Sequence, residues 1–533
     1  MSKPFFITTA IDYTNGAPHV GHAYEKVLAD VLARYQRQIG RKVFFLTGVD
    51  QHGQKVQQSA EKLGVPPQQF VDGVTAQFLE RWEKLGIGYD AWAATTAPRH
   101  KECVRAILQR LWDDLDPVTG TSRWIYKAAR SGHYSVRQEQ FLTDKERGPD
   151  GSFGPEWGLV EFREEENYYF RLAEHRDWLL GLIDLRSAEG RPFVQPDFRV
   201  AELRNAVEKL EGDLCISRPK SRLSWGIEFP FDSDFVTYVW FDALVNYISF
   251  APGYDPAPAR PPQEFLLWWR TVIHDIGKDI LIPAHGVYWP VMLKALGFAD
   301  DEMPTLLVHG WLNISGAKMS KSLGNSIDPV ILAEKYGSQA VRYYLMSDIT
   351  MGRDADFSEE RIVLRHNVDL ANGLGNLVNR TLNMTLRYRD GSPRSVPLPH
   401  DLEKHLADNK LLGLDHHASK MGEGQVQGAL EAMINLVNRA NALVDSSAPW
   451  KMAKDPSQSD RLDAVLITLI LSVRTAATML VAVVPEAATE ILRQVNLPAE
   501  SLDSESLSVS LPEGYRCGEP KPVFPRLELQ VKG

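Results

Sequence analysis

Cysteine is scarce in this chain, and basic residues are outnumbered by acidic ones. Its 533 residues include three cysteines (Cys103, Cys215 and Cys517), which lie far apart and form no CxxC pair. This argues against a disulfide framework and against a cysteine zinc site, and it fits a reducing cytoplasm. The formal net charge is −10, so a nucleic-acid partner would have to be held by local patches and not by a generally basic surface.

Secretory and membrane-spanning segments are not evident either. Residues 1–4 and the strand-like residues after them lack the plan of a signal peptide. The one long apolar run covers residues 464–484 and is interrupted by Arg474. It could be a membrane span, but we interpret it as the buried final helix of a bundle. No internal repeat or low-complexity tract is visible.

The first fifty residues predict an α/β fold. Residues 5–9 and 43–46 are short apolar runs typical of buried strands. Between them, one helical face is formed by Val27, Leu28, Val31, Leu32 and Tyr35. Strand–helix–strand order predicts a doubly wound, parallel, Rossmann-type sheet. Residues 19–22 then follow the first strand, in the crevice where such sheets bind ligands.

Changes in composition divide the rest of the chain. We predict a catalytic sheet domain in two halves, 1–115 and 213–300, separated by a polar, aromatic and turn-rich insertion over 116–212. Residues 237–241 and 279–282 are predicted strands of the second half, and the Pro- and Ala-rich residues 252–262 a surface loop. Apolar spacing becomes helical from about residue 366, which predicts an α-helical bundle over 366–500 and a tail, 501–533, that folds back.

A lysine motif in the middle of the chain suits a phosphate clamp. Residues 318–322 read Lys-Met-Ser-Lys-Ser, flanked by Gly316 and Gly324. Lys318 and Lys321 can neutralise a triphosphate, and the flanking glycines make closure of the loop over ATP plausible. The alternative is an ordinary solvated turn.

A histidine motif near the N-terminus suits a fixed ATP site. Residues 19–22 read His-Val-Gly-His at the start of the predicted helix. His19 and His22 offer imidazole N–H donors, Gly21 lets a nucleotide approach the backbone, and the helix N-terminus adds donors for anions. The alternative is half of a zinc site, for which no third ligand stands nearby.

Together, and about three hundred residues apart, these motifs resemble the HIGH and KMSKS signatures of class I aminoacyl-tRNA synthetases. Further stretches resemble the methionyl-tRNA synthetases over nearly the whole chain: residues 7–11, 45–53, 212–218, 238–244 and 276–280. The resemblance implies that methionine and ATP form an adenylate, whose acyl group passes to the 3′-terminal adenosine of tRNA(Met). In this scheme residues 301–365 contact the tRNA stem and carry the lysine loop.

The resemblance also implies which residues bind the small substrates. For ATP they are His19, Gly21, His22, Gly277, Asp279, Lys318 and Lys321, with catalysis by the two histidines and the two lysines. For methionine they are Ala10, Ile11, Tyr13, Asp50, Trp240, Ala243, Leu244, Tyr247, His285 and Trp289. Aromatic rings suit a polarizable thioether, and Asp50 suits the α-ammonium group. For the aromatic residues the alternative is ordinary core packing.

The chain departs from the family pattern at three places. Ser135 and Gln138 stand where many methionyl enzymes have the cysteines of a zinc knuckle, so we predict no structural zinc. The spacing from Asp279 to His285 is one residue longer than usual, and Asp12 stands where the family more often has proline or an aromatic residue.

The helical region resembles the anticodon-reading domain of the family. Trp450 is implied to stack on an anticodon base, and Asn376 and Arg380 to read base edges. The alternative is that Trp450 plugs the end of the bundle and Arg380 is solvated. We further expect a monomer in the cytoplasm, without a membrane partner, and Mg²⁺ held mainly by the ATP phosphates.

Two other functions remain open from the sequence. A tRNA-binding paralogue without catalysis could keep the fold but would not require the two motifs. A class I synthetase for another apolar amino acid would conflict with the implied pocket and with the lack of a large editing insertion.

Overall fold

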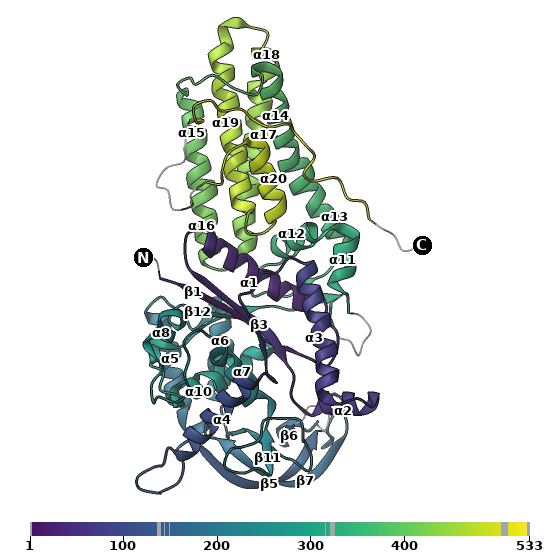
Figure 1. The fold of residues 1–533 in the computed structure, drawn as a ribbon, viewed down its shortest axis with the longest axis vertical. Coiled ribbons are helices and arrows are strands. Elements are labelled where there is room, and N and C mark those ends of the chain that lie inside the picture. The colour runs from purple at the N-terminus through teal and green to yellow at the C-terminus, as the bar shows by residue number, and fades with distance from the viewer. Residues whose placement is uncertain are drawn as a thin grey trace.

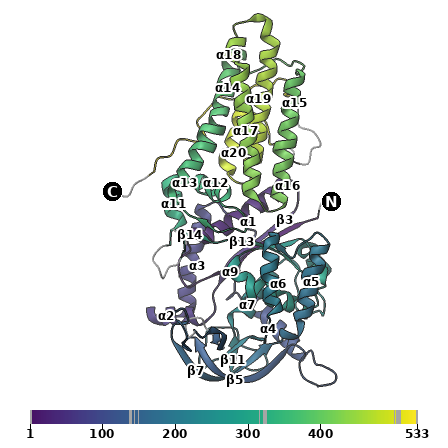
Figure 2. The ribbon, with the colours of Figure 1, turned by 180° about the vertical axis from the view of Figure 1, so that it is seen from behind.

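The chain folds into an elongated molecule with a helical bundle at one end and a small antiparallel sheet at the other (Figures 1 and 2). The structure is a computed structural model, and it describes residues 3–135, 140–142, 144–148, 150–314, 316–319, 326–500, 502 and 510–529. A parallel sheet lies between these two ends (Figure 1).

The central sheet is parallel throughout the pairs that the structure describes. Its strands are β1 (Phe5–Thr9), β2 (Asp12–Tyr13), β3 (Val43–Asp50), β4 (Ala91–Ala94), β8 (Val194–Gln195), β12 (Val272–Gly277) and β13 (Thr305–His309). β1 lies between β3 and β12, β13 follows β12, and β8 lies beyond β13. β4 and the short β2 also pair with β3. The predicted doubly wound α/β fold is therefore confirmed.

Helices cover both faces of the sheet and make two apolar cores. α1 (Val20–Gln38) and α3 (Pro67–Lys84) share one core with the bundle. The helices of the other core are α4 (Pro98–Asp113), α5 (Arg176–Ala188), α6 (Val200–Glu208), α7 (Val239–Ser249), α8 (Gln263–Trp269) and α10 (Trp289–Ala295). α2 (Gln54–Leu63) follows β3 at the end of the sheet that faces the small antiparallel sheet (Figure 1).

Two predicted strands are wrong. Residues 237–241 include only the end of β11 (Phe235–Thr237), and α7 begins at Val239. Residues 279–282 follow β12 and belong to α9 (Lys278–Ile280) and to the π-helical segment Leu281–Tyr288. Both runs are apolar because the helices are buried, and a short buried helix has the same composition as a buried strand.

The predicted insertion contributes three strands to a four-stranded antiparallel sheet. Its order is β6 (Gln140–Leu142), β5 (Ile125–Ser135), β7 (Val160–Phe170) and β9 (Leu214–Cys215), while β10 (Ser217–Pro219) pairs with β11. The structure differs from the predicted boundaries in two respects. β9 lies beyond residue 212 and still pairs with β7 of the antiparallel sheet. β8, inside residues 116–212, pairs with β13 of the central sheet, so the chain returns to that sheet before residue 212.

Short elements connect the central sheet to the bundle. β14 (Leu312–Ile314), β15 (Ala317–Lys318) and β16 (Ala355–Asp356) form a small sheet, and α11 (Pro329–Tyr336) and α12 (Ser338–Asp348) lie between β15 and β16 along the chain. The buried guanidinium of Arg342 on α12 donates to Asp30 of α1 (2.6 Å) and to the carbonyl of Val483 (2.8 Å). Arg342 therefore joins the sheet domain to the bundle.

The bundle consists of long antiparallel helices (Figure 1). They are α13 (Glu359–Arg365), the π-helical η8 (His366–Gly375), α14 (Asn376–Arg389), α15 (His400–Asp408), the π-helical η9 (Asn409–Asp415), α16 (His416–Gly422), α17 (Val426–Ser447), α18 (Pro449–Met452), α19 (Ser459–Leu480) and α20 (Pro485–Val495). α19 has the length and composition of a membrane span, but 94% of its apolar window is buried inside the protein. The tail returns along the bundle, where the Asn367 amide donates to the carbonyl of Leu527 (2.8 Å).

Candidate active site

A cavity of about 730 Å³ opens at the carboxyl ends of the central strands. Ala10, Asp50, Gly277 and Gly310 lie at or just beyond the ends of β1, β3, β12 and β13, and all four line it. From β1 the sheet continues to β3 on one side, and from β12 to β13 on the other. Open α/β sheets bind ligands at such a point, where the order of the strands reverses.

Most of the predicted small-substrate residues that the structure describes share this cavity. Those on its wall are Ala10, Ile11, Tyr13, His19, Gly21, His22, Asp50, Trp240, Ala243, Leu244, Tyr247, Gly277, Asp279 and His285. The candidates for ATP and for methionine therefore lie around one continuous space.

The two histidines of the N-terminal motif form the cap of α1. Nδ1 of His19 accepts from the Gly21 N–H (3.1 Å), and Nδ1 of His22 accepts from the His19 N–H (3.1 Å). Because both Nδ1 atoms are acceptors, the hydrogen of each neutral ring is on Nε2. A Cβ atom on Gly21 would lie only 2.9 Å from the His19 ring, so this cap requires glycine. The site thus presents two imidazole donors beside a helix N-terminus, which favours anions.

Gly277 and Asp279 follow β12. Gly277 precedes the short helix α9, and the exposed carboxylate of Asp279 faces the same cavity. A Cβ atom on Gly277 would lie 2.8 Å from Asp279 Oδ1. Nearby, the Lys278 ammonium lies 3.9 Å from the centre of the Trp311 ring, and Trp311 also lines the cavity.

The described part of the lysine motif reaches the cavity. β15 ends at Lys318, and the next residue, Met319, is buried on the cavity wall. The side chain of Lys318 and the whole of Lys321 lie outside the described residues.

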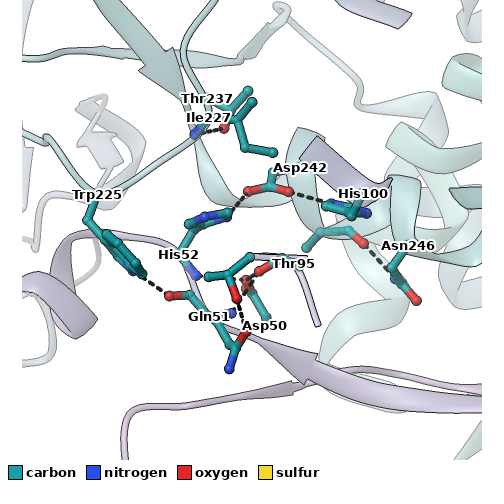
Figure 3. Close-up of polar contacts among 12 residues, drawn as sticks. Asp50, Gln51, His52, Thr95, His100, Trp225, Ile227, Thr237, Asp242 and Asn246 are labelled. Atoms are coloured by element: carbon teal, nitrogen blue, oxygen red, sulfur yellow. Dashed lines mark hydrogen bonds and ion pairs between the residues drawn. The ribbon is translucent and has the colours of Figure 1, made fainter. Parts of the chain in front are cut away.

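Asp50 ends β3 with its carboxylate on the cavity wall (Figure 3). The Thr95 hydroxyl and the His52 amide N–H both lie 3.4 Å from Asp50 Oδ1. The Trp225 indole N–H donates to the Gln51 carbonyl (2.6 Å), so the segment after Asp50 is held in place.

A buried carboxylate on α7 holds the same segment from the other side (Figure 3). Asp242 Oδ2 lies 2.6 Å from His52 Nδ1, and Oδ1 lies 2.7 Å from His100 Nε2. Burial by itself would raise the pKa of Asp242, but the two imidazoles outweigh it and lower the pKa to about 2. Asp242 is therefore ionised and orients both rings.

One face of α7 forms the apolar wall. Trp240, Ala243, Leu244 and Tyr247 are spaced by three and four residues and line the cavity together. The Tyr247 hydroxyl donates to His285 Nε2 (2.7 Å), since His285 Nδ1–H donates to the Ile280 carbonyl (2.9 Å). Burial lowers the pKa of His285 to about 4, so the ring is neutral.

Trp289 lies one layer behind this wall. It is fully buried, its indole N–H donates to His274 Nε2 (3.0 Å), and its ring lies 5.8 Å from that of Tyr247. The cavity wall does not include it. The extra residue between Asp279 and His285 falls where the helix is interrupted, because the backbone of Ile282 is extended (φ −118°, ψ 126°), and His285 still reaches the cavity.

Several wall residues were not among the predicted site residues. They are Asp12, Glu25, Lys55, Tyr238, Asn246, Ile280, His309, Gly310, Trp311, Leu312 and Met319. Two signals could have found some of them. Glu25 follows His22 by three residues on the same helix face, and His309 to Leu312 follow a buried strand whose carboxyl end must reach the same edge.

The predicted anticodon residues lie on the bundle. Asn376 is exposed at the start of α14, and Arg380, one turn later, donates to Asp445 of α17 (2.7 Å). Trp450 on α18 is 39% exposed. α18 lies at the end of the bundle far from the sheet (Figure 1).

Among the described residues no group of three or more His, Cys, Asp or Glu side chains could hold a metal ion. The predicted lack of structural zinc remains a prediction, because Gln138 lies outside those residues.

Comparison with known proteins gives consistent matches over the whole chain. The family model described as tRNA synthetases class I (M) matches residues 5–150 and 158–382. The methionine–tRNA ligase of Deinococcus radiodurans is 39% identical over 99% of this chain and 75% of that protein. That of Rhizobium meliloti is 39% identical over 98% of both chains.

Solved structures match as well. The structure of Mycobacterium tuberculosis methionyl-tRNA synthetase in complex with methionyl-adenylate matches with a TM-score of 0.88 and 36% identity. The match covers 98% of this chain and 100% of that one.

Proposed function

From the premise that the chain belongs to the class I (M) family of tRNA synthetases, we propose that it is a methionine–tRNA ligase. It activates methionine with ATP to methionyl-adenylate and transfers the acyl group to the 3′-terminal adenosine of tRNA(Met). The observation that carries the proposal is the single cavity shared by the residues implied for ATP and for methionine.

Adenylate formation requires positioning and charge neutralisation, not a general base. The methionine carboxylate is already ionised at neutral pH and attacks the α-phosphorus of ATP, which expels pyrophosphate. His19 and His22 donate from Nε2 to the phosphate oxygens as charge accumulates on them in the transition state. The N-terminus of α1 adds backbone N–H groups at the same place.

On the nucleotide side, Gly21 and Gly277 let ATP lie close to the backbone, and the Asp279 carboxylate accepts from the ribose hydroxyls. Lys318 and Lys321 neutralise the triphosphate when their loop closes. Mg²⁺ accompanies ATP on its phosphates. Met319, the residue after Lys318, lines the same cavity as both histidines, which supports this arrangement.

On the amino-acid side, Asp50 pairs with the α-ammonium group of methionine. The side chain lies among Ala10, Ile11, Tyr13, Trp240, Ala243, Leu244, Tyr247 and His285, with Trp289 as support behind Tyr247. A neutral, aromatic wall suits the thioether. Because the Tyr247 hydroxyl already donates its hydrogen bond to His285 Nε2, neither of these two groups requires a hydrogen-bond partner from the substrate.

The bundle is proposed to read the anticodon through Asn376, Arg380 and Trp450. Residues 301–365 are proposed to contact the tRNA stem, so the tRNA spans from the end of the bundle to the cavity. We propose a monomer acting in the cytoplasm, with residues 116–212 as a connective insertion apart from the return at β8.

Methionine-dependent exchange of pyrophosphate into ATP tests the proposal. We expect exchange with methionine, and a kcat/KM at least about tenfold lower with leucine, isoleucine and valine, because apolar pockets discriminate by about 1–3 kcal/mol per methylene. No exchange with any amino acid would indicate a tRNA-binding paralogue without catalysis. A preference for one of the other three would indicate a different synthetase.

A further inference from the structure

A buried lysine lies directly behind the cavity wall, and among the described residues its side chain bonds to three that form this wall. Lys26 on α1 has a fully buried side chain. Its ammonium donates to the Ala10 carbonyl (2.9 Å), to Asp12 Oδ1 (3.0 Å) and to Glu25 Oε1 (2.7 Å). All three acceptors line the cavity, whereas Lys26 does not. An ammonium group has three hydrogens, and each one has an acceptor here.

The contacts of Lys26 extend to the nucleotide side of the cavity. Glu25 Oε2 lies 3.0 Å from Nε2 of His309, which is also a wall residue. His309 ends β13 opposite Gly277 of β12. A continuous chain of hydrogen bonds therefore runs from Ala10 and Asp12, on the proposed methionine side, to His309, on the proposed ATP side.

The charges of this group balance only when Lys26 is present. Burial alone would lower the pKa of Lys26, but Asp12 and Glu25 outweigh it and raise the pKa, so the ammonium stays charged. Burial raises the pKa of Asp275, the remaining carboxyl group near Glu25 and His309. Two carboxylates (Asp12 and Glu25) then face two cations (Lys26 and His309), while Asp275 is neutral.

We propose that Lys26 is a positioning residue of the active site, which fixes Ala10 and Asp12 on the wall and offsets the charge of Asp12 and Glu25, so that the methionine carboxylate and the ATP phosphates can bind. The inference rests on the proposed function, because methionine and ATP bring the carboxylate and phosphates that an uncompensated wall would repel. Without Lys26 the group formed by Asp12, Glu25 and His309 has one net negative charge in a partly buried space, where water screens it poorly. The proposed role can be distinguished from simple fold stabilisation. If Lys26 acts through its charge, removing the charge of Asp12 should restore the substrate binding that is lost without Lys26.

The test uses matched variants in the pyrophosphate exchange assay. Lys26→Gln keeps a hydrogen-bond donor and Lys26→Met keeps the length of the side chain, and both remove the charge. We expect each to raise the methionine KM about tenfold, equivalent to about 1.4 kcal/mol, with a parallel rise in the ATP KM. The double variant Asp12→Asn/Lys26→Met restores neutrality and should return the methionine KM to within about threefold of the wild-type value.

Arg342→Met is the control. Arg342 is also a buried cation bonded to α1, through Asp30, but none of its bonds reaches the cavity. We expect it to lower the unfolding temperature and to leave both KM values unchanged.

Two results would overturn the inference. The first is that the Lys26 variants behave like Arg342→Met, with a lower unfolding temperature and unchanged KM values. The second is that the methionine KM of the double variant is as high as that of Lys26→Met. If Lys26→Met does not fold, the KM values of Lys26→Gln and of the double variant still test the inference. Wild-type protein without methionine-dependent exchange would instead refute the proposed function itself.

Discussion

At the scale of single residues, burial and neighbours set the protonation state of each histidine around the cavity. His285 is neutral because its burial lowers the pKa by more than the Ile280 carbonyl and the nearby Glu25 and Asp279 carboxylates raise it. His309 is equally buried, yet it lies 3.0 Å from the Glu25 carboxylate. Burial alone would lower the pKa of His309, but the Glu25 carboxylate outweighs it and raises the pKa to about 9. Two histidines of one cavity thus carry different charges at neutral pH.

The His309–Glu25 pair predicts a pH-dependent contribution to stability. The folded-state pKa of His309 is about 9, above the value of about 6.5 in an unfolded chain. The stabilisation is therefore fully present below about pH 6.5 and is lost as the pH rises through 9. We expect His309→Gln to lower the urea unfolding midpoint most at pH 6 and progressively less towards pH 9.5. A difference in midpoint that stays constant over this range would contradict the charged pair.

The sequence predicts the position of a side chain when neighbouring residues of the chain are enough to fix it. The His19 to His22 cap needs only helical spacing and glycine, so a four-residue motif places both imidazoles. Asp12 and Lys26 could not be paired in this way. They come from different elements, and only packing of α1 against β1 and β2 brings them together.

At the scale of secondary structure, the insertion has cation–aromatic contacts at the position of a zinc knuckle. Tyr134, next to Ser135, is fully buried. The guanidinium carbons of Arg163 and Arg222 lie 4.7 and 4.3 Å from the centre of its ring. Arg222 also pairs with Glu165 (3.0 Å). These contacts join β5, β7 and the segment after β10 without a metal ligand.

Tyr134→Leu should therefore destabilise the insertion by about 2–3 kcal/mol, from lost ring burial and lost cation–π contact. Hydrogen exchange of the β5 and β7 amides would measure the loss. Phe162→Leu, at a position on β7 that is 69% exposed, is the matched control and should change exchange little. Metal analysis of the wild-type protein should find no stoichiometric zinc. If a chelator removed the protection of the β5 and β7 amides from hydrogen exchange, this account would be contradicted.

Helix α7 shows where the spacing of apolar residues fails to predict secondary structure. Its wall residues recur at helical spacing, but Phe241, Val245 and Ile248 are buried on its other side. Even its polar residues, Asp242, Asn246 and Ser249, are buried. Because the helix has no solvent-exposed polar face, its first residues were predicted as a strand.

At the scale of the whole molecule, the proposed activation site and anticodon site lie far apart. The cavity opens at the central sheet, and α18 lies at the far end of the bundle (Figure 1). Between them, Arg342 and the contact of Gln38 with the Thr478 carbonyl (2.9 Å) fix the bundle to α1. A tRNA bound at both places would be positioned by one continuous body.

This separation predicts that Trp450→Ala weakens tRNA binding without affecting activation. A base stacked on an aromatic ring contributes about 1–3 kcal/mol, so the tRNA KM should rise about tenfold. Pyrophosphate exchange should stay at the wild-type rate, because Trp450 contacts nothing near the cavity. Leu411→Ala, at another exposed apolar position of the bundle, is the control and should change neither quantity. An equal loss of exchange in Trp450→Ala would instead point to a role in folding.

The sequence by itself determined the parallel α/β sheet, the helical bundle and the chemistry of the two motifs, because these depend on local periodicity and on residues close together in the chain. Only the tertiary structure decided which side chains share the cavity. It placed Trp289 behind the wall, returned β8 to the central sheet, and set Lys26 against Asp12 and Glu25. The physical reason is that burial and ion pairing arise between elements that are distant in sequence, and no local pattern specifies those contacts.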